Sequence, residues 1–257
     1  MARSLDLMRS ELEHAVAGSN RGRGAADALC ATCTALVDVD GAAVSLIHDG
    51  GSSGTYGSSN AASRRLDEYQ FMFGEGPCLD AVATRSEILV PDMDSWTEQR
   101  WPAFRGAALG DGVRGVFALP IMITSVCVGA LDLFRARPGP LEGDSLAGAR
   151  LAAELASAPL MDLIAEARAV IDANEASFAA AEAEVESSVE LDRVEVYQAS
   201  GMLIAALEVS ADEAMARLRA HAIATDQTPS EVARAIIERR LTLERDDHEG
   251  GPGRCPQ

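Results

Sequence analysis

The side chains best suited to covalent, redox or metal chemistry in this sequence of 257 residues are five cysteines and four histidines. Cys30 and Cys33 have the spacing of redox and metal-binding pairs, but they fall in a segment with helical periodicity, and no second pair completes four ligands. The histidines are scattered, and no H-E-x-x-H or G-x-S-x-G motif is present. The sequence therefore predicts no metal site, no cofactor and no catalytic residue, and we interpret the cysteine pair as part of a core.

Cys78 is the cysteine placed best for nucleophilic chemistry. It follows a Gly-Pro turn at the predicted start of a helix, where the helix dipole favours a thiolate. No basic partner can be identified beside it in the sequence. A small-molecule enzyme that uses Cys78 as its nucleophile is therefore kept as an alternative to a protein that is not an enzyme.

The charged residues exclude several enzyme classes. All 22 basic residues are arginine, and a chain without lysine cannot run P-loop phosphate binding, kinase-type catalysis or a Schiff-base mechanism. The formal net charge of −18 opposes nonspecific binding to phosphate backbones, so any contact with a nucleic acid must be local. The N-terminal residues carry charges where a signal peptide would be apolar, and we expect a cytoplasmic protein.

The elements that would position these groups begin with an α+β domain. Apolar and β-branched runs predict strands at 42–48 and 87–91. The uncharged run 115–131 approaches the length of a membrane span, but Pro120 and the polar pair Thr124-Ser125 divide it into pieces of strand length, which indicates a buried hairpin and no membrane contact. Because helical segments surround adjoining strands, we expect an antiparallel sheet flanked by helices, with a ligand pocket between the sheet and residues 74–80.

A heptad pattern follows this domain. Apolar and small residues recur in alternating steps of four and three from Leu160 to Val185, and these positions would form the contact seam of a coiled coil. Asn174 is a polar residue in this seam, of the kind that fixes the register of a dimer. Residues 160–195 contain ten acidic residues and two arginines. We interpret the segment as a long linker helix that forms a parallel two-chain coiled coil, with a solvated single helix as the alternative.

The C-terminal segment has the signals of three helices. Ser210 with Glu213, and Thr228 with Glu231, have capping-box spacing before two helical segments. Gly201 lies inside the preceding helix, where glycine costs about 1 kcal/mol relative to alanine. Either close backbone packing or an approaching ligand must explain that glycine.

Two parts of the chain resemble known families. Residues 197–241 resemble an ANTAR domain along the whole stretch YQASGMLIAALEVSADEAMARLRAHAIATDQTPSEVARAIIERRL. Upstream, FGEGPCLDAV, RWPAF and GVRGVFALPI with VGALDLF resemble a GAF domain, as found before ANTAR domains in actinobacterial regulators. ANTAR domains are three-helix RNA-binding modules that act in transcription antitermination by stabilising paired hairpin loops of a leader transcript. The resemblance implies this function, with RNA as partner and a signal or small-molecule ligand in the GAF domain.

The resemblance also divides the chain and supplies an RNA-binding face. The expected parts are an N-terminal extension (1–22), a GAF-like sensor domain (23–158), a coiled-coil linker helix (159–186), an ANTAR domain (187–245) and a disordered tail (246–257). The RNA-binding residues are expected to be Gln198, Ser200, Gly201, Arg217, Arg219 and Arg234. At the place of Ser200 the family usually has lysine, so one cation is missing. The alternatives are a GAF-fold enzyme of the free methionine sulfoxide reductase type that uses Cys78, and a C-terminal module that binds protein only.

Overall fold

The computed structural model describes residues 5–18, 22–48, 51–162, 165, 193–225 and 227–243. These residues belong to two compact units, Met1–Asp192 and Arg193–Gln257. Most of the predicted linker helix and all of the predicted tail lie outside the described residues. Leu160, the first position of the predicted seam, is buried in the core of the N-terminal unit.

The N-terminal unit is built on a five-stranded antiparallel sheet in the order β2-β1-β5-β4-β3, which confirms the expected α+β fold. The strands are β1 (Gly41–His48), β2 (Gly51–Ser58), β3 (Ile88–Val90), β4 (Gly115–Ile123) and β5 (Val126–Arg135). The last two form the hairpin that was expected from the divided apolar run. Among the described helices, none combines the length and the apolar character needed to span a membrane.

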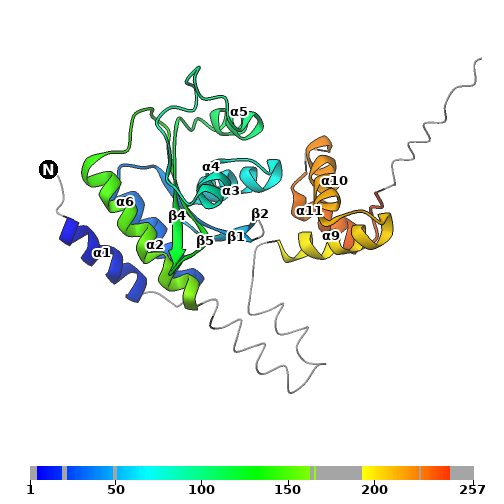
Figure 1. Ribbon diagram of the computed structural model, residues 1–257, viewed down its shortest axis with the longest axis horizontal. Helices are drawn as coiled ribbons and strands as arrows, with labels where there is room; N and C mark the ends of the chain where they lie inside the picture. The colour runs from blue at the N-terminus through cyan, green and yellow to red at the C-terminus, as the bar shows by residue number, and fades with distance from the viewer. Residues whose placement is uncertain are drawn as a thin grey trace, which may run out of the picture. The chain divides into compact units, whose positions relative to one another are not determined.

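Helices cover both faces of this sheet (Figure 1). On one face pack α2 (Arg23–Leu36) and α6 (Gly143–Leu155), with α1 (Leu5–Gly18) packed against both. On the other face pack α3 (Ala61–Phe73) and α4 (Pro77–Thr84), with α5 (Pro102–Gly110) beside α3. The predicted extension over residues 1–22 therefore contains a helix that contributes Met8 and Leu12 to the core.

The alternation of side chains along the strands decides which residues meet the α3 and α4 face. In β5, Leu131 and Leu133 belong to the core that includes α2 and α6, while Phe134 belongs to the core beside α3 and α5. Successive side chains of a strand point to opposite faces, so Asp132 shares the face of Phe134. By the same rule Ser45 of β1 lies on that face, opposite Val44.

The C-terminal unit consists of α9 (Val194–Leu207), α10 (Ala211–Ala224) and α11 (Pro229–Ile237), as the sequence predicted. Ser210 caps α10 by accepting a hydrogen bond from the backbone N–H of Glu213, at 3.2 Å. Thr228 and Glu231 form a complete capping box at the start of α11. These caps satisfy N–H groups that have no partner inside the helix, so both helices begin where the sequence indicates.

Candidate functional site

The first helix of the C-terminal unit presents two of the predicted RNA-binding residues to solvent. Its buried stripe runs through Val196, Ala199 and Leu203, because α9 packs against α10 and α11. Gln198 and Gly201 are both exposed and lie three residues apart, so they share one exposed side of the helix.

Gly201 has no packing partner that would require a glycine. A Cβ atom built on it would meet no heavy atom within 4 Å among the described residues outside its own helix backbone. Close packing inside the unit therefore does not explain why a helix-weakening residue occupies this exposed position.

Ser200 does not lie on this exposed side, which corrects its assignment as a surface contact. Its exposed fraction is 6%, and it continues the buried stripe one turn after Val196. Each residue turns the helix by about 100°, so residue 200 is carried from the side of Gly201 toward the core. Proximity in sequence to Gln198 and Gly201 was a poor guide to the direction of this side chain.

The two arginines of α10 are on opposite sides of a buried residue. Leu218 is fully buried, and Arg217 and Arg219 precede and follow it, so they diverge around the helix. Arg217 pairs with Glu213 one turn earlier, with 2.7 Å between Nε and Oε1. Burial lowers the pKa of the Arg219 guanidinium, and the neighbouring charge of Arg193 lowers it further, while Tyr197 acts in the opposite direction.

Arg234 is brought to α9 from the third helix. Its side chain is 63% exposed and contacts Oε1 of Glu195 at 3.2 Å. Glu195 and Gln198 lie three residues apart, so Arg234 reaches the exposed side of α9 that also carries Gln198. The structure therefore brings Arg234 toward Gln198 and Gly201, and it separates Arg217 from Arg219.

Tyr197 is a candidate that the sequence analysis missed. It is 44% exposed on α9, one turn before Gly201, and interacts electrostatically with Arg219. We call Tyr197, Gln198 and Gly201 the α9 face. An exposed aromatic one turn before a mid-helix glycine was the signal in the sequence that could have identified it, since aromatic rings are the usual platform for unstacked bases.

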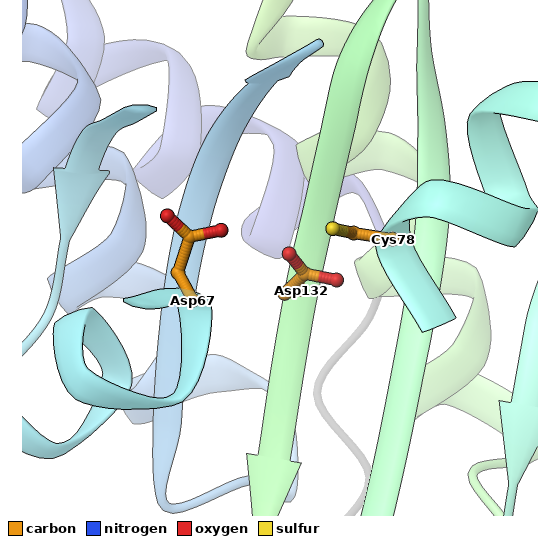
Figure 2. A group of neighbouring side chains, drawn as sticks. All are labelled: Asp67, Cys78 and Asp132. Carbon is orange, nitrogen blue, oxygen red and sulfur yellow. The ribbon is translucent and has the colours of Figure 1, made fainter. Parts of the chain in front are cut away.

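The N-terminal unit contains a second set of candidate residues, a buried polar cluster between the sheet and α3 and α4. Its members are fully or almost fully buried: Ser45, Thr55, Asp67, Gln70, Cys78 and Asp132. Asp67 comes from α3, Cys78 from α4 and Asp132 from β5, and in Figure 2 the Asp132 carboxyl group stands between the other two side chains. Burying this many polar groups is costly unless they bind one another or a ligand.

Hydroxyl groups hold the two carboxyl groups of the cluster together. The Oγ atom of Ser45 lies 2.5 Å from Oδ1 of Asp67 and 2.9 Å from Oδ2 of Asp132. Thr55 donates to the other oxygen of Asp67 at 2.5 Å. Gln70 donates to Asp132 through Nε2 at 3.4 Å and accepts a hydrogen bond from the backbone N–H of Cys78 at 2.8 Å.

The pKa of the Asp132 carboxyl group is raised in this arrangement. Burial raises the pKa of its carboxyl group to about 8, and the charge of Asp67 contributes to the rise, although hydrogen bonds from Ser45, Gln70 and Cys78 oppose it. Ser45 has one hydroxyl proton for two carboxyl groups, so its two contacts together require a proton on one of these carboxyl groups. The raised pKa favours Asp132 as the group that holds it.

The polar cluster occupies the space in which an apolar pocket was expected. Ser45, Gln70, Cys78 and Asp132 are fully buried between the sheet and α3 and α4, and hydrogen bonds join them there. A cavity of about 650 Å³ lies elsewhere, next to α6, β4 and the end of α4. An exposed pair between Arg150 and Glu87 lines that cavity, with 2.7 Å between Nε and Oε1.

The cysteines expected in the core are there. Cys30 and Cys33 are fully buried in α2, and burial raises the pKa of Cys33 to about 12, which disfavours the thiolate that redox chemistry needs. Cys78 is also fully buried. A nucleophile must be reached by its substrate, so the burial of Cys78 weighs against the enzyme alternative.

Comparisons with known proteins agree with this division of the chain. A family model described as GAF domain matches residues 23–160, and one described as ANTAR domain matches residues 190–237. No curated protein sequence matches the chain.

Solved structures similar to the chain include other GAF domains and an enzyme. The GAF domain of a phosphoenolpyruvate-protein phosphotransferase from Coxiella burnetii is 18% identical, with a TM-score of 0.47, over 63% of this chain and 94% of that one. The corresponding Acinetobacter domain is 14% identical, with a TM-score of 0.48, over 67% and 99%. Free methionine-R-sulfoxide reductase from Neisseria meningitidis is 15% identical, with a TM-score of 0.46, over 59% and 85%.

Proposed function

The chain belongs to the GAF domain family over residues 23–160 and carries an ANTAR domain over residues 190–237, and from this premise we propose how it works. It is a cytoplasmic transcription antitermination regulator that binds hairpin loops of a leader transcript through its ANTAR domain. The GAF domain senses a signal and controls that binding. The observation that carries the RNA interface is the exposed glycine of the α9 face, which no contact inside the unit explains.

The α9 face has the chemistry that loop RNA requires. Tyr197 offers a ring for stacking, Gln198 an amide for base edges, and Gly201 a place where a sugar or phosphate can approach the backbone. Arg234 and Arg219 flank the face and supply local positive charge in an acidic protein. With few cations in reach, binding should depend weakly on salt, by a slope of about −0.7 per phosphate neutralised on single strands.

The direct test is a mobility-shift titration with a paired-hairpin RNA. The full chain is compared with a chain that ends at residue 192, where the first compact unit ends. We expect a complex with the full chain and none with the shortened chain. Absence of a complex with every hairpin tested, together with capture of a protein through the same three helices, would favour the protein-binding alternative.

We expect Gly201→Ala to stabilise the ANTAR domain and to weaken RNA binding. Alanine at an exposed helical position without steric conflict adds about 1 kcal/mol to the free energy of unfolding. The added methyl group projects from the α9 face and obstructs the approach of the RNA backbone. Thermal denaturation and the mobility shift measure the two effects, which have opposite signs.

The matched control is the double variant Gly201→Ala, Ala205→Gly. Ala205 is exposed one turn later in α9, so the double variant restores the helix propensity and keeps the methyl group at position 201. RNA binding should remain weak in it. Wild-type affinity in both variants would show that RNA does not approach the helix at this glycine.

We propose that the protein is a homodimer through a coiled coil that ends near Val185. Ile171 and Phe178 occupy seam positions of the heptad pattern, and an aspartate there would bury a charge against its copy in the partner chain. The double variant Ile171→Asp, Phe178→Asp should have the mass of a monomer in light scattering. Ala176→Asp adds a charge outside the seam and should leave the mass of a dimer, while a dimeric double variant would eliminate this interface.

A further inference from the structure

We propose that Asp67, Cys78 and Asp132 bind one divalent transition-metal ion, such as Zn²⁺ or Fe²⁺, inside the GAF domain. Each residue offers one ligand atom, and these three atoms all lie within 4.8 Å of one another. The residues come from three different elements, α3, α4 and β5, and their side chains converge in Figure 2.

The spacing of the ligand atoms is close to what a metal requires. Zinc binds thiolate sulfur at about 2.3 Å and carboxylate oxygen at about 2.0 to 2.2 Å, so in a tetrahedral site two ligand atoms lie about 3.4 to 3.6 Å apart. The three atoms, which lie within 4.8 Å of one another, must therefore draw together by up to about 1 Å to share one ion, a change that side-chain rotations can supply. Two carboxylates and a thiolate provide the mixed oxygen and sulfur donors that zinc and iron accept.

One buried oxygen atom points to a missing cation. Oδ1 of Asp132 is inaccessible to solvent and makes no hydrogen bond of normal geometry among the described residues. A carboxyl group with an unsatisfied oxygen in a protein interior is costly, and most buried polar atoms avoid this state. A bound metal ion would satisfy Oδ1 directly.

The polar side chains around the three proposed ligands hold them in place by hydrogen bonds. Ser45 bonds to both carboxyl groups and Thr55 bonds to Asp67, while Gln70 links Asp132 to the backbone of Cys78. Such outer hydrogen bonds orient the ligands and keep them together before the ion arrives. Metal binding would release the protons of the Cys78 thiol and of Asp132.

The test is titration of the full chain with Co²⁺ after removal of metals with a chelator. Binding of cobalt to a thiolate produces charge-transfer absorption in the near ultraviolet, so the signal reports Cys78 directly. Because the site is buried, the chain is also refolded with Co²⁺ present, which removes any barrier to entry. We expect saturation at one ion per chain and displacement of cobalt by Zn²⁺.

Two variants change proposed ligands, a third changes a positioning residue and a fourth is the control. Cys78→Ser and Asp132→Asn should abolish the absorption, and circular dichroism checks that each is folded. Asp132→Asn keeps the shape of the side chain, so it tests the site even if Cys78→Ser does not fold. Ser45→Ala should weaken binding by about 10-fold to 100-fold, as expected for a residue that positions ligands. Cys33 lies in the core on the other face of the sheet, so Cys33→Ala should leave cobalt binding unchanged. No absorption after refolding, or absorption that persists in Asp132→Asn, would overturn the proposal.

Discussion

We expect the Asp132→Asn variant to lose much less stability than the wild type between pH 5 and pH 8, both measured with chelator present. The pKa of Asp132 is raised to about 8 in the folded protein, whereas the same carboxyl group has an ordinary pKa of about 4 in the unfolded protein. Between these values the folded state holds a proton that the unfolded state has released. The stability that this proton supplies is complete at low pH and is lost as the pH rises to about 8.

The expected effect on the free energy of unfolding is large because the pKa of one buried carboxyl group differs strongly between the folded and the unfolded state. One pH unit in this window removes up to about 1.4 kcal/mol from the free energy of unfolding, and the loss ceases above the folded pKa. Asparagine keeps the shape of the side chain and does not titrate. Urea unfolding at several pH values gives the comparison, and Asp144→Asn, an exposed carboxylate of α6, should follow the wild type. Parallel curves for the wild type and Asp132→Asn would contradict the assignment of the proton.

We expect Gly129→Ala to be among the most destabilising single substitutions in the GAF domain. A Cβ atom on Gly129 would lie 2.1 Å from the backbone oxygen of Ser45, well inside van der Waals contact. That oxygen belongs to β1, which pairs with β5 along six residue pairs, so the backbone cannot move away without breaking the ladder. Overpacking costs typically about 1 to 3 kcal/mol, and we expect the upper end of this range here because the contact is with backbone.

A second alanine substitution is the control for the backbone effect. Gly106 lies in α5, and a Cβ atom there would meet nothing within 4 Å among the described residues. Gly106→Ala should therefore raise the free energy of unfolding by up to about 1 kcal/mol. The urea midpoints of the two variants should move in opposite directions. An unchanged midpoint for Gly129→Ala would show that β1 and β5 separate more easily than the structure indicates.

Sequence reasoning recovered the elements whose signals are local. The hairpin of β4 and β5 was predicted from an interrupted apolar run; its turn falls at the polar pair Thr124-Ser125, while Pro120 lies inside β4. The start of α11 was predicted from the capping-box spacing of Thr228 and Glu231. The same reasoning failed for Ser200. It assigned the residue by its neighbours in sequence, while the packing of α9 turned that position into the core.

What the sequence by itself determined is therefore the secondary structure and the family of each domain, because capping, periodicity and ordered motifs act within short stretches of chain. Only the tertiary structure decided which polar residues meet. Asp67, Cys78 and Asp132 carry no common motif, and the chain between them contains a glycine turn, the helix α5 and the two strands β3 and β4. They come together because strand alternation directs Asp132 to the face on which α3 and α4 pack, and long-range packing of this kind leaves no local trace in the sequence.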